Sequence, residues 1–316
     1  MNAGWMLREL DAPSDRAAIA DLWRAALAPA WPVLPRGLDV IRSGFIAVEA
    51  GPAGAGSAGN AGADAVNAGP GRRVVGVVAV DPAGSVPAVM VAPDRQRRGI
   101  ASALLAEAER YLRRLGVAEV RAGSGGAEYI WPGVPTDLPA AGAFFAARGW
   151  RVESRTIDLT RDLVDYAPPP GVCEQASQAS IAIDTATDED RDAVFAFEAA
   201  TFRSWLPAFQ RWDASVLVAR DASERIVGTL LYSGPDTDEM FRPMLGPRCG
   251  AIGCVGVAPD AEGRGIGSAM VARASELLRE RGTRTCHIGW VVRESFYTRL
   301  CYAPWRGYLM YRKALA

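Results

Sequence analysis

Residues 257–268 read VAPDAEGRGIGS and residues 91–102 read VAPDRQRRGIAS, so this chain of 316 residues carries nearly the same stretch twice. The offset between the copies is constant, because 257 − 91 = 166 and 265 − 99 = 166. Each copy follows an apolar run with strand character and precedes a segment whose apolar residues recur at helical spacing. In both places the sequence therefore predicts a strand, a turn rich in glycine and arginine, and a helix.

Turns of this kind favour an anion. The first backbone N–H groups of a helix have no partner inside it, and the helix dipole is positive there. Glycine lets a ligand come close to the backbone, and arginine adds charge-assisted hydrogen bonds to phosphate. The ligand that the two turns predict is therefore a diphosphate.

Two common diphosphate-binding patterns do not fit the repeated stretch. The Walker pattern needs Gly-Lys-Ser/Thr, and neither copy has the lysine. The dinucleotide pattern needs G-x-G-x-x-G, whereas residues 263–267 read GRGIG and the first copy keeps only Gly99.

Composition narrows the class of protein further. An apolar content of 49% is typical of a globular protein, and a net charge of −1 argues against a general nucleic-acid binder. No apolar run approaches the roughly 18 residues of a membrane span. The five cysteines form no C-x-x-C pair, and we see no secretory signal. We therefore expect a cytoplasmic protein with free thiols.

Strands and helices are predicted in the same order in both halves, which indicates a repeat of a whole domain. We expect an N-terminal domain at 1–160, a linker at 161–180 around the PPPG of 168–171, and a C-terminal domain at 181–316. Residues 51–71 are almost all Gly, Ala, Pro, Asn and Ser, so we expect a mobile insertion there. Strands are expected at 5–10, 45–49, 73–80, 86–91, 117–122, 150–159, 181–185, 216–219, 226–232, 251–257, 285–291 and 308–312. Helices are expected at 13–27, 100–115, 140–148, 188–202 (with Asp188 as its cap), 266–281 and 294–300.

The repeated stretch matches the pattern V-x-P-x-x-Q/R-x-x-G-x-G/A of the GNAT acyltransferases. The first copy fits in full through Gln96, Gly99 and Ala101, and the second departs from the pattern only at Glu262. Together with the repeated order of elements, this means that the chain resembles a tandem GNAT N-acetyltransferase over essentially its whole length.

The resemblance implies an α/β (α+β) fold and a cosubstrate. Each domain would have a mixed, mostly antiparallel twisted sheet flanked by helices, whose fourth and fifth strands run parallel and splay apart. Acetyl-CoA would lie in that wedge, with its diphosphate on the turn and its pantetheine arm along the fourth strand. The implied binding residues are Val255, Val257, Gly263, Arg264, Gly265, Ile266, Gly267 and Ser268 in the second domain, and Met90, Val91, Gln96, Arg97, Arg98, Gly99, Ile100, Ala101 and Ser102 in the first.

The resemblance also implies direct transfer, in which an amine attacks the thioester and a tyrosine early in the last short helix protonates the CoA thiolate. Tyr297 matches that position, whereas the first domain has Phe145. A phenol with a pKa of about 10 is protonated at neutral pH and can act as the acid. We therefore expect the chemistry in the C-terminal domain, although Glu262 places a like charge near the diphosphate.

The general base stays open at this stage. Glu294, Asp238 and Glu239 are more often solvated surface carboxylates, and a lone strand histidine such as His287 is more often a packed residue than a base. Many members of the family use a water chain instead.

The reaction expected is acetyl transfer to a primary amine of a small molecule by a monomer or homodimer, without a metal, nucleic acid or membrane partner. One alternative is a non-catalytic acyl-CoA-binding or sensing protein on a duplicated GNAT scaffold. Another is a tandem enzyme of low-molecular-weight thiol biosynthesis. Tyr297 discriminates between the first two, since only the enzyme needs its hydroxyl.

Overall fold

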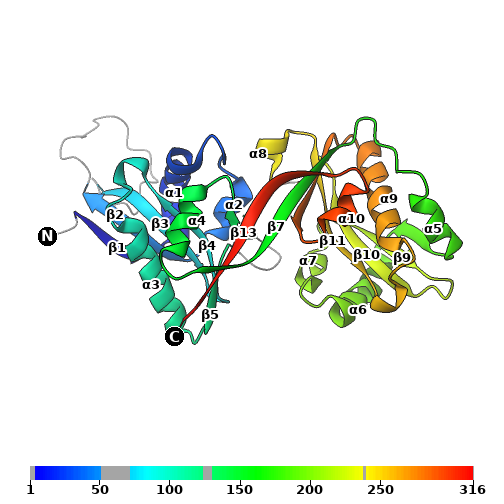
Figure 1. Cartoon of the computed structure of the whole chain (residues 1–316), viewed down its shortest axis with the longest axis horizontal. Helices are drawn as coiled ribbons and strands as arrows, with labels where there is room; N and C mark the ends of the chain where they lie inside the picture. Colours follow the sequence, from blue (N-terminus) through cyan, green and yellow to red (C-terminus); the bar gives the residue numbers. More distant parts are fainter. Residues whose placement is uncertain (1–3, 51–71, 124–129, 238–239, 316) are drawn as a thin grey trace. The chain divides into compact units, whose positions relative to one another are not determined.

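The computed structural model describes residues 4–50, 72–123, 130–237 and 240–315. They form two compact units: an N-terminal unit, Met1–Ser154 with Tyr308–Ala316, and a C-terminal unit, Arg155–Gly307 (Figure 1). Each unit thus includes a strand segment from the other half of the chain. The insertion expected at 51–71 lies outside the described residues.

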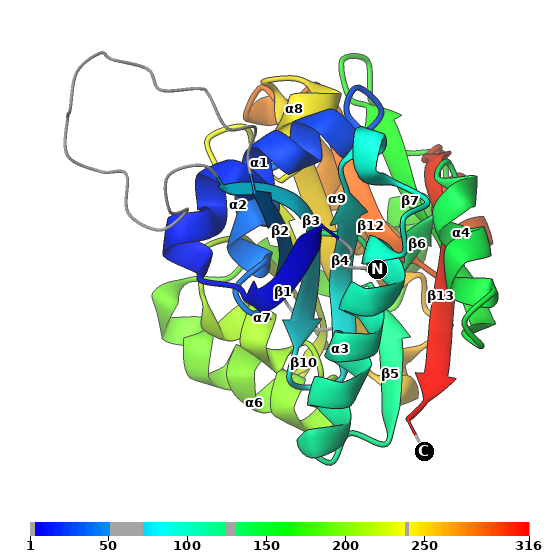
Figure 2. The same ribbon diagram turned by 90° about the vertical axis from the view of Figure 1, so that its left-hand side faces the viewer.

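The N-terminal unit has a mixed sheet in the order β1-β2-β3-β4-β5-β13. Its neighbours are antiparallel except β4 and β5, which are parallel, and α3 packs against β2, β3 and β4 while α1 packs against β3 and β4 (Figure 2). Its elements are β1 (Trp5–Glu9), α1 (Ala12–Leu27), α2 (Pro35–Val40), β2 (Gly44–Ala50), β3 (Arg72–Asp81), β4 (Ser85–Val91), η1 (Pro93–Arg95), α3 (Ile100–Arg114), β5 (Glu119–Ala122), β6 (Val134–Pro135), α4 (Pro139–Ala146) and the first residues of β7 (Arg151–Asp162).

The C-terminal unit repeats this plan in the order β8-β9-β10-β11-β12-β7. Again only one pair of neighbours, β11 and β12, is parallel. Its elements are α5 (Val172–Gln178), β8 (Ala182–Thr185), η2 (Asp188–Asp190), α6 (Arg191–Thr201), α7 (Leu206–Gln210), β9 (Ser215–Arg220), β10 (Ile226–Ser233), α8 (Arg242–Leu245), β11 (Cys249–Val257), η3 (Pro259–Ala261), α9 (Ile266–Glu280), β12 (Thr285–Val291), α10 (Glu294–Thr298) and the start of β13 (Ala303–Ala314).

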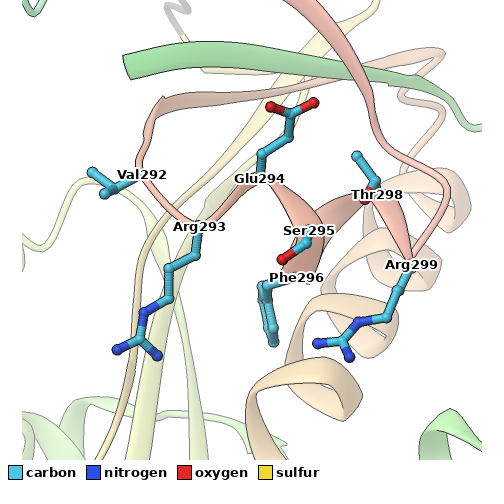
Figure 3. A pocket seen from close by; sticks show the side chains of 7 residues that line it. All are labelled: Val292, Arg293, Glu294, Ser295, Phe296, Thr298 and Arg299. Carbon is cyan, nitrogen blue, oxygen red and sulfur yellow. The ribbon is translucent and has the colours of Figure 1, made fainter. Parts of the chain in front are cut away.

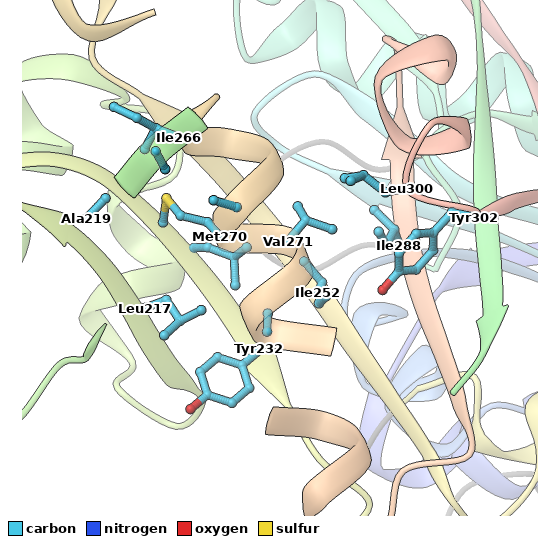
Figure 4. Close-up of a cluster of buried hydrophobic side chains, with 14 of the residues drawn as sticks. Leu217, Ala219, Tyr232, Ile252, Ile266, Met270, Val271, Ile288, Leu300 and Tyr302 are labelled. Atoms are coloured by element: carbon cyan, nitrogen blue, oxygen red, sulfur yellow. The ribbon is translucent and has the colours of Figure 1, made fainter. Parts of the chain in front are cut away.

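Helices cover both faces of this sheet, as the alternation along β9 shows. Leu217 and Ala219 point into the core beneath α9, where Met270 is fully buried (Figure 4). Val216 and Val218 point to the opposite face and pack beneath α6 and α7. Successive side chains of a strand point to opposite faces, so a strand with apolar residues at every position is buried on both.

The expected fold class is confirmed: each unit has a mixed sheet with one parallel pair, flanked by helices. Two details differ. Thr187, not Asp188, caps the helical segment, because its side chain and that of Asp190 form a reciprocal capping box. Within 161–180, the stretch expected as a linker, α5 forms and packs against α9.

The parallel pair of the C-terminal unit opens into a wedge. β11 and β12 pair only as far as Ile252 and Ile288. Beyond that point the pairing of β11 with β10 slips by one residue around Cys254, and that of β12 with β7 slips around Trp290. Cys254 and Trp290 have φ of +49° and +55°, which side-chain-bearing residues rarely adopt. Such bulges bend strands, and here they bend two neighbours at the same level.

A buried carboxylate holds the second bulge. Asp158 on β7 is fully buried, and its Oδ1 accepts the Trp290 N–H at 2.9 Å. One pleat away, the Thr156 hydroxyl donates to the Val291 carbonyl at 2.8 Å. Because β12 turns away from regular pairing here, these side chains replace ladder hydrogen bonds that the bulge removes.

We predict that Asp158→Ala lowers the free energy of unfolding of the C-terminal unit by about 2–3 kcal/mol, because it removes the charged acceptor of the Trp290 N–H from a part-buried site. Asp158→Asn keeps an acceptor oxygen and should cost less. The measurement is urea denaturation followed by tryptophan fluorescence.

Asp162→Ala is the matched control, since Asp162 lies on the same strand with its side chain 60% exposed. In this variant the free energy of unfolding should fall by only about 0.5 kcal/mol, as for other surface substitutions. Equal losses for Asp158→Ala and Asp162→Ala would show that the bulge does not depend on Asp158.

Candidate functional site

The turn that precedes α9 has the conformation of an anion site. Gly263 and Gly265 have φ of +79° and +74°, and Gly265 is the N-cap of the helix, with no side chain capping it. Ile266 is buried and anchors the first turn of α9. Arg264 and Glu262 are exposed. The first N–H groups of a 15-residue helix can therefore receive a phosphate.

The corresponding turn of the N-terminal unit has the same form. Gly99 is the N-cap of α3 with φ +83°, and Arg97 has φ +62°. Arg97 and Arg98 are both exposed. Gln96 is used inside the turn, where its amide donates to the Val91 carbonyl at 3.3 Å. Gln96, the residue that completes the V-x-P-x-x-Q/R pattern, therefore helps to shape the turn.

Arg148, which the sequence did not indicate, extends the positive charge of this N-terminal turn. It follows α4, donates to the Phe144 carbonyl at 2.9 Å and holds its guanidinium 3.8 Å from the centre of the Phe144 ring. It also donates to the hydroxyl of Ser102 in the first turn of α3. Two exposed arginines and this third one thus lie at the start of α3.

An open pocket of about 570 Å³ lies along α10 in the C-terminal unit. Figure 3 shows Arg293 and Arg299 pointing to the same side of α10, with Phe296 between them. A Cβ at Gly267 would lie 3.3 Å from the Phe296 ring, so this pocket adjoins the first turn of α9. The lining residues are Val292, Arg293, Glu294, Ser295, Phe296, Thr298 and Arg299.

The splayed end of β11 presents its residues to both faces of the sheet. Val255 and Val257 are half-buried and pack against the core beneath α9. Cys254 packs on the other face, with the cluster beneath α6 and α7. The backbone of this part of β11 has left its parallel neighbour, so an extended ligand can pair with it as an added strand.

Tyr297 stands on α10 beside this wedge. Its ring packs edge-on against Phe296, with centroids 4.7 Å apart. Burial raises its pKa to about 12, with a smaller contribution from the nearby Cys254 thiol. The phenol therefore stays protonated throughout the physiological pH range and can donate a proton.

Glu198 on α6 is the functional candidate that sequence reasoning missed. Its side chain is fully buried, and Oε1 accepts the Thr229 hydroxyl at 2.5 Å. Oε2 has no hydrogen-bond partner among the described residues. Burial raises the pKa of Glu198 to about 7, against the opposing effect of the Thr229 hydrogen bond. The sequence did contain a signal for its burial, because Val194 and Glu198 are four residues apart and so lie on the same, buried face of α6.

Cys254 is not a nucleophile in this setting. Burial raises its pKa to about 12, and the neighbouring Glu198 carboxylate raises it further, while Arg211 acts in the opposite sense. The thiolate, not the thiol, is the reactive form of cysteine. Cys254 therefore stays a thiol, and its backbone conformation is its contribution to the site.

His287 is enclosed by neighbouring side chains and is not accessible as a base. Its Nε2 lies 3.3 Å from Asp158 Oδ2 without meeting hydrogen-bond geometry. The rings of Phe241 and Trp305 lie 4.6 and 5.6 Å from its ring. Only 5% of the residue is exposed. Of the remaining candidates for a base, Glu294 is exposed along the pocket, and residues 238–239 lie outside the described residues.

The same region of the N-terminal unit is filled. By the offset of 166, Ala88 corresponds to Cys254. Here β4 pairs with β3 in register from Ala88 to Val91, and the register shift falls earlier, between Ser85 and Ala88. The indole N–H of Trp131 donates to the Pro87 carbonyl at 2.7 Å. Phe145, at the position of Tyr297, is buried against Trp150. Tyr129, which the sequence offers as a substitute acid for the N-terminal domain, lies outside the described residues.

Trp131 is itself held in place by two further tryptophans. The ring of Trp23 lies 5.7 Å away and that of Trp31 lies 5.4 Å away, edge-on. The indole N–H of Trp23 donates to the Trp31 carbonyl at 2.9 Å. Three buried indoles therefore pack together, and one of them contacts β4 at Pro87, directly after its last parallel pair with β5.

Two regions of the chain, 46–125 and 183–303, match the model of the Acetyltransferase (GNAT) family. Together they cover well over half of the chain and include both copies of the turn. Two matched regions, each with a parallel strand pair and a turn leading into a helix, define a tandem acetyltransferase fold. The chain belongs to the GNAT acetyltransferase family.

Relatives with assigned names point to acetyl transfer. Mycothiol acetyltransferase of Cellulomonas flavigena is 30% identical over 236 residues, which are 68% of this chain and 62% of that protein. Mycothiol acetyltransferase of Clavibacter sepedonicus is 28% identical over 222 residues, 65% of this chain and 64% of that protein. The match therefore spans less than two thirds of the length of these relatives.

Solved structures agree on the fold. A glucosamine N-acetyltransferase region of a fungal multi-domain β-N-acetylglucosaminidase has a TM-score of 0.82 and 25% identity, and covers 99% of this chain and 38% of that one. A tandem GNAT protein from the clavulanic acid biosynthesis pathway has a TM-score of 0.62 and 17% identity, and covers 99% of both chains. The second likeness shows the fold alone.

Two further properties concern only the part of the chain that the structure describes. None of its helices is long and apolar enough to cross a membrane. The same residues contain no group of three or more histidine, cysteine or carboxylate side chains arranged to hold a metal ion.

Proposed function

We propose that this protein is an acetyl-CoA-dependent N-acetyltransferase that moves an acetyl group to a primary amine of a small molecule, and that its C-terminal unit carries out the reaction. The observation that carries the proposal is the gathering of Tyr297, Cys254 and Glu198 at the splayed end of β11, beside the uncapped start of α9. A proton donor, an opened strand and an anion site are the parts that this transfer needs.

The contrast between the units supports the choice of the C-terminal one. The indole N–H of Trp131 is hydrogen-bonded to the Pro87 carbonyl, at the point where an acyl group would approach β4. Phe145 has no hydroxyl to offer in place of Tyr297. Among its described residues, the N-terminal unit thus keeps an anion-binding turn, but it has Trp131 beside β4 and no hydroxyl at the position of Tyr297.

In the C-terminal unit, the turn from Gly263 to Ser268 would hold the diphosphate of acetyl-CoA through backbone N–H groups, with Arg264 nearby. Arg293 and Arg299, on the side of α10 seen in Figure 3, add positive charge. The backbone of Val255 and Val257 would pair with the pantetheine arm. We propose that the N-terminal residues Met90, Val91, Gln96, Arg97, Arg98, Gly99, Ile100, Ala101 and Ser102 form a second CoA-binding surface without turnover.

Tyr297 is the proposed catalytic acid. It donates its phenolic proton to the sulfur as the carbon–sulfur bond breaks, so that CoA leaves as a thiol rather than as a thiolate. Transfer is direct, because Cys254, the thiol nearest the reacting centre, stays protonated and cannot take the acetyl group first.

The acceptor is proposed to be a small molecule with a primary amine. The likeness to a glucosamine N-acetyltransferase region makes glucosamine the first acceptor to test. The named relatives are mycothiol acetyltransferases, so an acceptor linked to that compound is the second. We further propose a monomer or homodimer in the cytoplasm, supported by five cysteines that form no disulfide.

We predict that Tyr297→Phe lowers kcat about 10- to 100-fold and leaves KM for acetyl-CoA unchanged, because it removes a proton donor used only as the thiolate departs. The measurement is CoA release with acetyl-CoA and glucosamine. Because the pKa of Tyr297 is raised to about 12, wild-type kcat should not fall through loss of this proton below roughly pH 11.

Tyr302→Phe is the matched control, a second buried tyrosine of the same unit. Its hydroxyl lies 2.7 Å from the Ser275 hydroxyl and 3.3 Å from the Cys286 sulfur, within the core. This change should reduce stability and leave kcat within about twofold. Unchanged turnover in Tyr297→Phe would remove Tyr297 from the mechanism and favour a non-catalytic acyl-CoA-binding protein.

We predict that Gly265→Glu weakens acetyl-CoA binding at the C-terminal turn at least about tenfold, since it sets a carboxylate at the start of α9 where the diphosphate would lie. Gly282→Glu, at the other end of α9, is the control for backbone strain, because Gly282 also has a positive φ, +82°. Calorimetry of acetyl-CoA binding compares the two. If Gly99→Glu abolishes all binding and Gly265→Glu none, the cosubstrate belongs to the N-terminal unit.

A further inference from the structure

We propose that Glu198 is the general base of the reaction: it receives the acceptor as an ammonium ion and takes the proton that frees the amine to attack. The inference rests on the proposed function and deepens it, because it assigns a charge to the acceptor. The substrate class that follows is a cationic primary amine.

The first observation is an oxygen without a partner. Glu198 is fully buried, Oε1 accepts one hydrogen bond from Thr229, and Oε2 accepts none from any described residue. Leaving a buried carboxylate oxygen unsatisfied is costly, and nearly all such groups in folded proteins have a partner. A ligand that donates N–H, such as an ammonium group, would satisfy Oε2 and offset that cost.

The second observation is the place of this carboxylate in the fold. Its charge acts on Cys254, the bulged residue at which β11 leaves β12. Four residues after Glu198, the Phe202 ring covers Gly256, so closely that a Cβ on Gly256 would lie 2.4 Å from it. Phe202 also stacks on Trp205, with ring centroids 4.8 Å apart. Glu198 therefore lies on the side of the sheet opposite α9, at the level of the acyl end.

Its surroundings leave it without a competing cation. On β10 its polar neighbour is Thr229, and on β11 it is Cys254. After α7, Arg211 acts on Cys254 and lies 3.4 Å from Asp213. At the start of α6, the carboxylates of Asp188 and Asp190 pair with Arg191 and Arg220. Among the described residues, none of these cations is paired with Glu198.

His287 is the rival base, and the topology disfavours it. It lies one residue before Ile288, where β11 and β12 are still hydrogen-bonded to each other. Asp158, Phe241 and Trp305 enclose its ring. Glu198, by contrast, neighbours the part of β11 that has already separated.

Two residues, Glu198 and Tyr297, account for the proton transfers of the reaction. Glu198 Oε2 takes one proton from the ammonium group, directly or through one water molecule, and the nitrogen forms a bond to the thioester carbonyl carbon. The carbon–sulfur bond breaks, and the sulfur receives the Tyr297 proton. The amide nitrogen then loses its extra proton to the Tyr297 phenolate, and Glu198 releases its own to solvent, so that one proton is produced for each acetyl group transferred.

The test is the pH dependence of kcat/KM for glucosamine in wild type, Glu198→Gln and Thr229→Val. The base must be ionised, so the wild-type rate should rise with pH, with a midpoint near the Glu198 pKa of about 7. The Thr229 hydrogen bond lowers that pKa, so Thr229→Val should move the midpoint to higher pH. Glu198→Gln should reduce kcat/KM about 100-fold. Its pH profile should also lose the limb, that is, the rise in rate with pH that ionisation of Glu198 causes. Titration of the acceptor itself is the same for all variants and cannot cause a difference between them.

Asp192→Asn is the matched control, an exposed carboxylate on the same helix that should leave the profile unchanged. If Glu198→Gln retains the wild-type rate and limb, the proposal is wrong, and loss of the limb in His287→Gln instead would make His287 the base. If the wild type transfers no acetyl group to any amine, the proposed function fails. A ¹³C NMR titration of glutamate carboxyls then still decides whether Glu198 ionises near neutral pH, and ionisation at an ordinary carboxyl pKa would overturn the inference.

Discussion

The separation of β11 from β12 after Ile252 and Ile288 is the constraint on which the site depends. Two parallel strands normally stay paired, and here two bulges lie at the level where they separate. A left-handed conformation at a residue with a side chain costs of order 1–3 kcal/mol, so Cys254 and Trp290 persist only because their surroundings hold them. Asp158 does this for Trp290 with a buried hydrogen bond. Strain of this kind is typical of functional sites.

The two units differ at the end of their parallel strand pair. In the N-terminal unit, the register of β4 with β3 slips between Ser85 and Ala88, and Trp131 satisfies the Pro87 carbonyl in that stretch, which follows the parallel pairing. Buried indoles contribute apolar contact area and donate their N–H groups, so this arrangement is stabilising. The C-terminal unit keeps two bulges and an unsatisfied carboxylate oxygen on Glu198, all of which cost stability. The N-terminal unit thus has the filled arrangement, and the C-terminal unit has the open, strained one.

Much of the fold could be predicted from the sequence, because its signals are local. The turns before α3 and α9 carry their glycines at positions that need positive φ, and the apolar periods place most strands within a few residues. Tyr297 could be proposed because it matches the position of the family's proton donor, early in the last short helix. Asp158 and Trp131 could not, because their partners are backbone groups 132 and 44 residues away. The role of Glu198 depends on which face of α6 meets the sheet, although its place in the apolar stripe was visible.

The exchange of strand ends between the units has a consequence for synthesis. The core of the N-terminal unit includes Tyr311 and Leu315, and that of the C-terminal unit includes Leu159 and Leu163. On the ribosome, the first repeat therefore cannot complete its core when its own residues have emerged, but must wait for those near 311–315. Contacts so distant in sequence slow folding, because the long loop must close before they form. The two halves thus repeat one fold, yet each completes its compact unit with a strand segment from the other half of the chain.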